Sequence, residues 1–365
     1  MISGVDLSTW QQMQDAGITY FNQKKAIKDV LSFISEKGIN SVRLRLWNDP
    51  FDENHLSYAG GENNLSTTLR IAQHMYNHHF SVFLDFHYSD FWADPGKQFK
   101  PKAWQNFPFV DLVSAVEKFT VATLIAFKKA DIPVSFVQIG NEITNGLLWP
   151  DGKIFAGDEI IPGGFDRLSQ LLQAGISATR KVFPQAKIVL HLERSGDADY
   201  YVFWFQELQK RKVDFDIIGL SYYPFYHGSL NAFSKTIDVC QQTLKCSTMI
   251  VETGYIYTTK SVEGNSLIVD DENDQRLPYP PTLKGQAAFI DDLLTLVKEK
   301  SILGFYYWEP LWLPGPHVSW SSLAGRKYIK EENKKGGNEW ANHALFDYDG
   351  HALPAWNMIE KHCKE

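Results

Sequence analysis

The sequence of 365 residues has few cysteines, no long apolar run and no basic stripe. Its three cysteines, Cys240, Cys246 and Cys363, give neither a disulfide framework nor the Cys-x-x-Cys spacing of a zinc site. No stretch of 18 apolar residues occurs, so we expect no membrane span. With 36 basic and 43 acidic residues the formal net charge is −7, which argues against nucleic acid as a partner.

The first residues, MISGVDLSTW, lack the basic and apolar regions of a signal peptide. They lead directly into an apolar run, so we expect a mature or trimmed form of the chain. Hydrophobic residues make up 44% and charged residues 22%, a balance that excludes disordered, collagen-like and coiled-coil proteins.

Eight short apolar runs alternate with segments whose apolar residues have helical spacing. The runs are Ile2–Asp6, Ser41–Trp47, Ser81–Tyr88, Ser135–Glu142, Lys187–Glu193, Phe215–Tyr223, Ser247–Tyr255 and Gly304–Glu309. The helical segments are 26–37, 65–79, 109–130, 165–183, 199–212, 230–245, 283–299 and 354–364. This alternation is typical of parallel βαβ units. We predict a single catalytic (β/α)8 TIM barrel over residues 1–365.

The segments from helix to strand are short, whereas those from strand to helix are long, up to residues 310–353. In a closed barrel all strand-to-helix loops emerge at the end that carries the active site. A doubly wound open sheet is the alternative, but eight units and the lack of a Gly-rich first turn weigh against it.

The predicted strands end in polar and charged residues, which are costly in a buried sheet unless they face a wet cleft or pair with each other. Glu142 ends the fourth run and Glu252 ends the seventh, so they face each other across the barrel mouth. Two such carboxylates suit glycoside hydrolysis, one as acid and base and the other as nucleophile. A salt bridge at the rim is the structural alternative.

Neighbouring residues supply supporting roles. Asn141 can reach the cleft beside Glu142 if the strand end bulges, and its amide can bind a sugar hydroxyl. Arg43 and Arg45 share one face of the second run, and Arg43 is expected to keep the nucleophile ionised. Tyr222 or Tyr223 can donate a hydroxyl to the nucleophile, with core packing as the alternative.

Further residues at the strand ends and in the long loops are candidates for substrate contacts. His87 and His191 favour hydrogen bonding near the acid or to sugar over metal binding, because too few further ligands converge, and a satisfied histidine in the core is the alternative. Trp47, Trp92, Trp149 and Trp308 are candidate stacking platforms, with burial in the core as the alternative for each. Asp49, Asp90 and Asp94 can bind hydroxyls or serve as capping residues.

At these residues the sequence resembles the arabinogalactan endo-β-1,4-galactanases of glycoside hydrolase family 53, in a large clan of retaining barrel enzymes. The matching stretches are Gly4–Ser8, Gly38–Pro50, Leu84–Gly96, Pro101–Trp104, Val137–Gly152, Val189–Leu192, Phe215–Gly228, Ile250–Tyr255 and Gly304–Pro310. The resemblance implies Glu142 as acid/base, Glu252 as nucleophile and internal cleavage of β-1,4-galactan from pectin with retention.

The resemblance also bears on metals and cofactors. Some bacterial members hold calcium after the seventh strand, but here residues Lys260–Asn265 lack the usual ligands. The acidic run Asp270–Asp274 is a substitute candidate, with a solvated loop as the alternative. We expect no required cofactor.

We therefore expect a monomeric, extracellular or cell-surface galactanase with polymeric β-1,4-galactan or galacto-oligosaccharides as partners. Three alternatives stay open: a clan relative acting on mannan, xylan or β-glucan, a carbohydrate-binding barrel without activity, and a metal-dependent barrel hydrolase. The segment 311–353 has no motif that can be interpreted.

Overall fold

The computed structural model describes residues 1–262 and 265–364, and its centre is a closed barrel of parallel strands. The barrel strands are β1 (Ile2–Asp6), β4 (Ser41–Leu46), β5 (Ser81–Phe86), β6 (Val134–Ile139), β11 (Lys187–Leu192), β12 (Ile217–Tyr222), β13 (Ser247–Thr253) and β14 (Gly304–Tyr307). β1 pairs with both β14 and β4, which closes the sheet. The predicted (β/α)8 barrel is confirmed.

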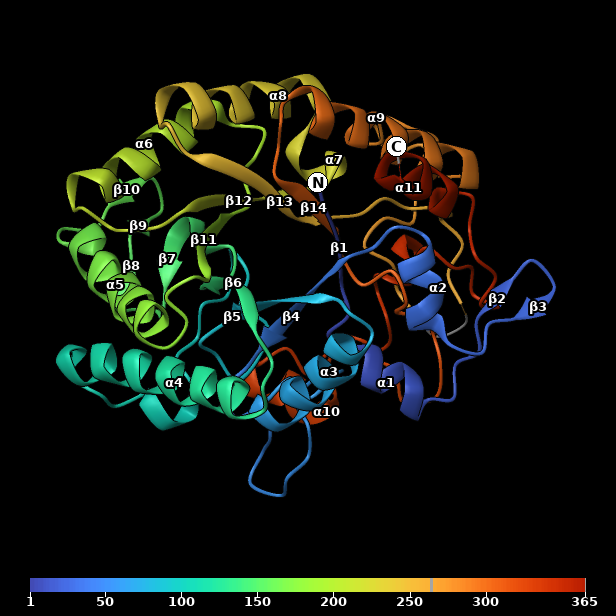
Figure 1. The fold of residues 1–365 in the computed structure, drawn as a ribbon. Helices are drawn as coiled ribbons and strands as arrows, with labels where there is room; N and C mark the ends of the chain where they lie inside the picture. Colours follow the sequence, from blue (N-terminus) through green and yellow to red (C-terminus); the bar gives the residue numbers. More distant parts are fainter. Residues whose placement is uncertain (263–264, 365) are drawn as a thin grey trace.

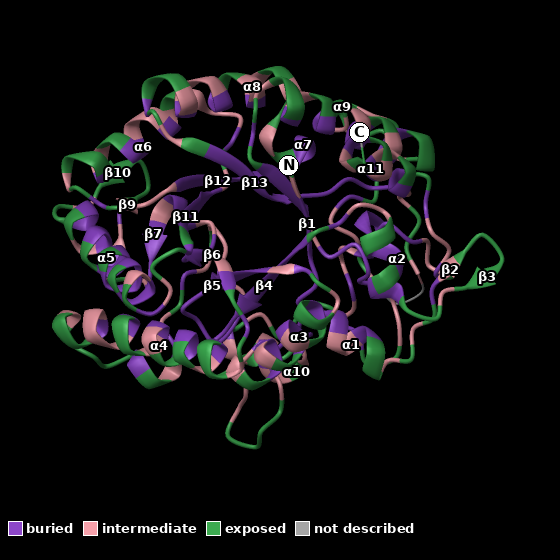
Figure 2. Cartoon of the chain, in the orientation of Figure 1, coloured by how far each residue is buried: buried purple, intermediate pink, exposed green. Residues whose placement is uncertain are grey.

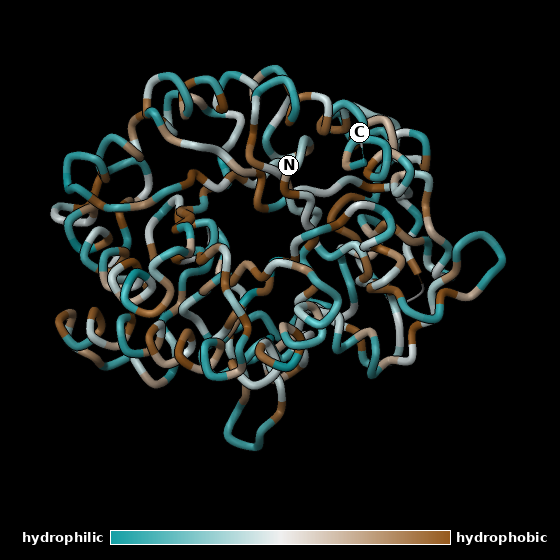
Figure 3. Tube along the Cα trace, viewed as in Figure 1, coloured by the Kyte–Doolittle hydropathy of each residue, from teal (hydrophilic) through white to brown (hydrophobic). Residues whose placement is uncertain are grey.

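The helices form a ring around the strands (Figure 1). The main ring helices are α2 (Val30–Glu36), α3 (Leu65–Asn77), α4 (Phe109–Lys129), α5 (Gly164–Val182), α6 (Ala198–Lys210), α8 (Leu230–Asp238), α9 (Leu283–Glu299) and α11 (Ala355–Lys364). Their inward faces are buried and their outward faces exposed and hydrophilic (Figures 2 and 3), as amphipathic spacing dictates. No helix in the described ranges is long and apolar enough to cross a membrane.

Short helices and strands lie in the loops. They are the helices α1 (Trp10–Asp15), α7 (Pro224–His227) and α10 (Leu323–Tyr328), and the short strands β2 (Phe21–Asn22), β3 (Lys25–Ala26), β7 (Gly146–Leu147), β8 (Gly152–Lys153), β9 (Phe155–Ala156) and β10 (Glu159–Ile160). The hairpin of β2 and β3 replaces the start of the helix predicted over 26–37. That helix begins later because the Asp29 side chain caps it, accepting from the backbone N–H groups of Leu31 and Ser32.

An apolar cluster fills the barrel interior at the amino ends of the strands. It consists of Phe83, Val189, Ile217, Met249, Val251 and Tyr306. The Tyr306 ring lies over Gly4, where a Cβ would come within 2.2 Å of it. This cluster is the floor on which the polar end of the barrel is built.

Candidate active site

A pocket of about 610 Å³ opens at the carboxyl ends of the barrel strands. We call it the main pocket. Ten of the predicted site residues lie on its wall: Arg43, Arg45, His87, Trp92, Asp94, Asn141, Glu142, Tyr223, Glu252 and Trp308. The long loops therefore surround the end of the barrel at which the two glutamates meet.

A turn with left-handed backbone brings Glu142 to the main pocket. β6 ends at Ile139, after which Gly140 has φ 82° and Glu142 has φ 47°. The left-handed region costs a non-glycine residue about 1–3 kcal/mol and is typical of functional sites. Asn141 and Glu142 thus both reach the pocket, by this turn rather than by the expected bulge.

The bulge occurs instead in β13, where it delivers Glu252. Leu220 of β12 pairs with Ile250, but the next residue, Ser221, pairs with Glu252, so Val251 is skipped. Val251 belongs to the interior apolar cluster, yet its neighbour Glu252 also reaches the pocket. A regular strand would have sent these neighbours to opposite faces.

Glu142 is held by a hydrogen-bonded relay. The Ser221 hydroxyl donates to Glu142 Oε1 (2.6 Å) and lies 2.8 Å from His191 Nε2. Because the hydroxyl has one proton, His191 Nε2–H donates to Ser221. Burial lowers the pKa of His191 well below its usual range, so the ring is neutral. Burial, together with the charge of Glu252, raises the pKa of Glu142 well above its usual range, and the Ser221 bond opposes this.

Glu252 has a cation beside it. Arg43 Nη1 lies 2.8 Å from Glu252 Oε1, and the Tyr223 hydroxyl donates to Oε2 (3.3 Å). Burial raises the pKa of Glu252 to about 7, and the Arg43 charge opposes this rise. Arg43 therefore favours the charged form of Glu252, whereas the charge of Glu252 favours the protonated form of Glu142. The pair can hold one protonated and one charged carboxyl at the same time.

Arg43 links several polar side chains at the bottom of the main pocket. Its guanidinium also contacts Asp85 (2.8 Å), Asp6 (3.1 Å) and the Asn141 side-chain oxygen (2.9 Å). The arginine is 1% exposed, so these carboxylates compensate a fully buried charge.

Arg45 and His87 form the adjoining wall. Arg45 Nη1 pairs with Glu309 (2.6 Å), and its guanidinium lies 4.2 Å from the Trp92 ring centroid. Its buried Nη2 has no hydrogen-bond partner among the described residues. Both His87 nitrogens are used within the protein, because Nδ1 accepts from the Trp47 indole N–H and Nε2 donates to Asp85.

Six predicted residues are not brought to the pocket wall. They are Trp47, Asp49, Asp90, Trp149, His191 and Tyr222. Trp47 has no exposed surface and packs in the core, where it binds His87. Trp149 instead lies beneath Lys153, whose Nζ is 4.3 Å from the ring centroid. Neither tryptophan is placed to stack on a sugar in the main pocket.

Tyr222 points outward because it follows the inward-facing Ser221 by one residue. Its ring stacks on Phe233 of α8 (4.1 Å between centroids), and its hydroxyl donates to the Gly228 carbonyl. Of the two tyrosines left open by the sequence, Tyr223 is the one that reaches Glu252.

The two loop aspartates hold the loops rather than the main pocket. The buried Asp90 carboxylate accepts from the backbone N–H groups of Asp49 and Lys102. Asp49 is exposed and lies 3.5 Å from the Lys102 ammonium. Asp94 does line the main pocket and pairs with Lys97 (2.7 Å).

The segment 311–353, which the sequence left uninterpreted, supplies a large part of the pocket wall. Its contributions are Trp312, Trp320, Glu331, Lys334, Glu339 and Trp340. The Trp340 ring lies 5.1 Å from Trp308 and 5.5 Å from Tyr223, so the aromatic wall combines distant parts of the chain. The Trp content of this rim loop was the one available signal for its role.

The acidic run proposed for calcium does not converge on a site. Asp274 is paired with Arg276, and Asp271 accepts from the Asn273 backbone within its own turn. Part of the preceding loop, residues 263–264, lies outside the described residues. Among the described residues of this loop, no three possible metal ligands lie together.

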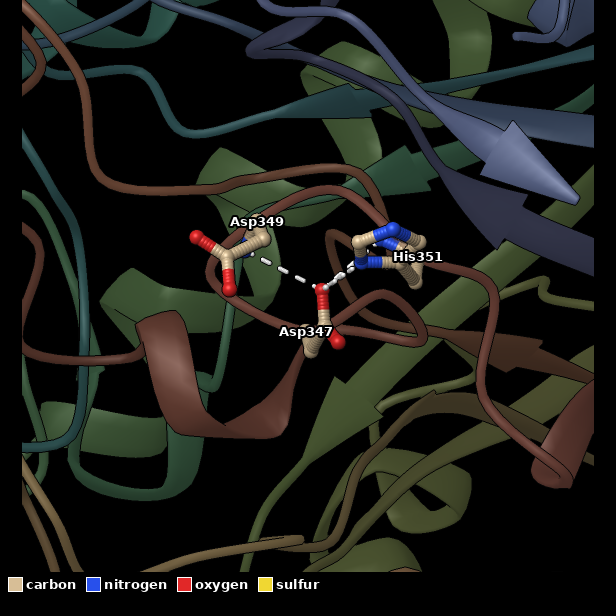
Figure 4. A group of neighbouring side chains, drawn as sticks. All are labelled: Asp347, Asp349 and His351. Atoms are coloured by element: carbon tan, nitrogen blue, oxygen red, sulfur yellow. Dashed lines mark hydrogen bonds and ion pairs between the residues drawn. The ribbon is translucent and has the colours of Figure 1, made fainter. Parts of the chain in front are cut away.

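A different group of possible metal ligands occurs at Asp347, Asp349 and His351 (Figure 4). Asp347 Oδ1 already accepts from the backbone N–H groups of Asp349 (3.1 Å) and His351 (2.7 Å). These bonds define a tight turn that the carboxylate stabilises. None of the three residues lines the main pocket.

Comparisons with known proteins agree with the barrel fold and with a pair of carboxyls at its carboxyl end. The family model described as "Glycosyl hydrolase family 53" matches residues 2–359. The chain belongs to glycosyl hydrolase family 53. This family 53 chain is 33% identical to the endo-beta-1,4-galactanase of Bacillus subtilis, over 98% of the chain and 85% of the relative. It is 32% identical to the arabinogalactan endo-beta-1,4-galactanase of Cellvibrio japonicus, over 97% and 89%.

A solved structure supports the same assignment. The GH53 catalytic domain of Ignisphaera aggregans is 35% identical, with a TM-score of 0.89 over 98% of this chain and 95% of that one. The resemblance inferred from the sequence motifs is thereby confirmed for the family and the barrel.

Proposed function

We propose that this protein is an endo-acting β-1,4-galactanase that cleaves internal bonds of galactan with retention of configuration. The observation that carries the proposal is that Glu142 and Glu252 open into one pocket, with the Arg43 cation beside Glu252 and the neutral Ser221–His191 pair beside Glu142. The substrate class is supported by the relatives, which are galactanases at about one-third identity.

In the first step Glu252 attacks the anomeric carbon of the bound galactose unit. Arg43 stabilises its charge before attack, and Tyr223 directs one carboxylate oxygen. Glu142 gives its proton to the glycosidic oxygen as the bond breaks, and the leaving chain departs with that proton. The product of this step is a galactosyl ester of Glu252.

In the second step Glu142, now ionised, takes a proton from water as the water oxygen attacks the anomeric carbon. The ester breaks, Glu252 is regenerated, and the galactose unit keeps its β configuration. The Asn141 side chain is fixed by Arg43 and by the Ala93 carbonyl (2.9 Å), so its amide is oriented to bind the 2-hydroxyl.

No step requires a cofactor, so we expect a chelator to leave activity unchanged. Because polymeric galactan cannot cross a membrane, the protein acts outside the cell or at its surface. The complete set of proposed groups comes from one chain, which is consistent with a monomer.

The test is incubation with pectic galactan, mannan, xylan and β-glucan, followed by sizing of the products and NMR of the first anomer released. We expect internal galactan cleavage and β-anomeric ends. Cleavage of another polymer in preference to galactan would contradict the substrate, and α-anomeric products would contradict retention.

A further inference from the structure

Two of the three cysteines flank the turn that joins α8 to β13. Cys240 lies in the π-helical turn Val239–Thr243, which follows α8 directly, and Cys246 immediately precedes β13. Cys240 has no exposed surface, whereas Cys246 is half-buried against the same apolar core. Neither cysteine lines the main pocket or takes part in the proposed reaction.

A closed backbone turn brings these two cysteines together. The Cys246 N–H donates to the Cys240 carbonyl (3.0 Å), and the intervening Lys245 has φ 56°, in the left-handed region. This is the pattern of the Schellman turn that ends many helices, enlarged by one residue because the last helical turn is π-helical. In a Schellman turn the side chains at the two bonded positions are frequently in contact. The turn therefore favours a contact between the two thiols.

The same hydrogen bond limits the distance between the two Cα atoms. With standard bond lengths, the path from the Cys240 Cα through its carbonyl oxygen to the Cys246 nitrogen and Cα spans less than about 7 Å. A disulfide needs Cα atoms no more than about 7 Å apart, so the pair lies within reach of a bridge. The thiols also affect each other, because burial and the neighbouring Cys246 thiol both raise the pKa of Cys240.

We propose that Cys240 and Cys246 are a redox modification site, which closes to a disulfide when the protein meets a small disulfide such as oxidised glutathione. The half-buried Cys246 attacks the oxidant as a thiolate and releases one small thiol. Cys240 then attacks the Cys246 sulfur and releases the second. Two protein thiols thus become one disulfide, and the oxidant is reduced to two thiols that carry the two protons. The weak bond from the Cys246 thiol to the Asp216 carbonyl (3.6 Å) is given up.

The bridge fastens the end of α8 to the start of β13. β13 delivers Glu252 near its opposite end, so the covalent link lies at the amino end of the strand that carries the proposed nucleophile. A cross-link removes open conformations from the unfolded chain and thereby favours the folded barrel. We therefore expect oxidation to change the stability of the protein rather than its turnover.

The first test uses trypsin, which cleaves after Lys245 and so separates the two cysteines into peptides 236–245 and 246–260. Burial raises the pKa of Cys246 to about 11, and the Asp216 carboxylate adds to this rise. The full-length protein is therefore incubated with oxidised glutathione at about pH 9, where more thiolate is present. We expect mass spectrometry to find the two peptides joined until they are reduced, and free thiols to fall from three to one.

Cys246→Ser and Cys363→Ser are the matched variants. Cys363 is also half-buried, and its thiol donates to the Ser3 hydroxyl (3.0 Å). Cys363→Ser should keep the joined peptides, whereas Cys246→Ser should lose them. Three free thiols after oxidation, a bridge that includes Cys363, or glutathione retained on Cys246 would each overturn the inference.

The second test measures what the bridge does. Oxidation should raise the melting temperature of the wild-type protein by about 2–5 °C and leave that of Cys246→Ser unchanged. A bridged wild-type protein whose melting temperature does not rise would overturn the inference that the turn already has bridging geometry. Neither test reads galactan cleavage, so a failure of the proposed function would leave the outcome distinguishable.

Discussion

On β5, Phe83 points into the apolar cluster of the barrel, and Asp85, two residues further, points into the charged end of the same interior. β11 repeats the change from Val189 to His191. Each strand therefore places an apolar and a polar side chain on one face, at different heights. The lower layer supplies burial, and the upper layer supplies chemistry.

The two layers differ in what they contribute to stability. Burial of apolar side chains in the lower layer is favourable without partners. The upper layer holds six buried polar or charged groups that need one another: Asp6, Arg43, Asp85, Gln138, His191 and Glu252. The site is therefore stable only as a complete network, whereas the apolar cluster beneath it needs no network.

The largest effect is expected from the proposed reacting carboxyls in the upper layer. Glu252→Ala or Glu142→Ala should lower kcat on galactan by about 10²–10⁴-fold or more, because the nucleophile or the acid is removed. Circular dichroism should show an intact fold. Near-normal galactan cleavage by either variant would contradict the assignment of Glu252 as nucleophile and Glu142 as acid.

Removing one residue from each layer separates activity from stability. Arg43→Met leaves buried carboxylates uncompensated and should cost about 3–5 kcal/mol of unfolding free energy, with loss of activity. Met249→Ala leaves a cavity and should cost about 2–5 kcal/mol, with kcat retained below the melting temperature. Denaturant melts and kinetics measure both. Loss of kcat in folded Met249→Ala would show that the layers are not separable.

The aromatic wall gives a smaller effect. Trp340→Ala should raise KM for galactan about tenfold, since a stacking surface beside Trp308 is lost. Trp149→Ala is the control, because this tryptophan lies off the pocket wall. An equal rise in KM for both variants would contradict the placement of the substrate.

The smallest change concerns the pH profile. Activity requires Glu142 to be protonated, so it falls as pH rises through the pKa of Glu142. The Ser221 hydroxyl stabilises the ionised form and lowers that pKa. Ser221→Ala should therefore move the alkaline limb to higher pH, while Ser169→Ala, a buried serine of α5, should not move it. A limb that moves to lower pH would contradict the relay.

Some side-chain positions could be predicted from the alternation of side chains along a strand and from the order of strands and helices, and others could not. Glu142 and Glu252 were found because polar residues at strand ends are conspicuous, but the backbone devices that deliver them differ, a left-handed turn at Glu142 and a bulge beside Val251. Tyr222 and Tyr223 could not be separated, because one residue of register decides which faces Glu252.

The alternation of strands and helices, the family motifs and the two proposed carboxyls can be predicted from the amino-acid sequence, because they depend on local periodicity and on residue type. The three-dimensional fold is needed to show that Trp340 completes the aromatic wall while Trp47 and Trp149 do not. A loop without periodic spacing is positioned by its packing against distant residues, which no local pattern records.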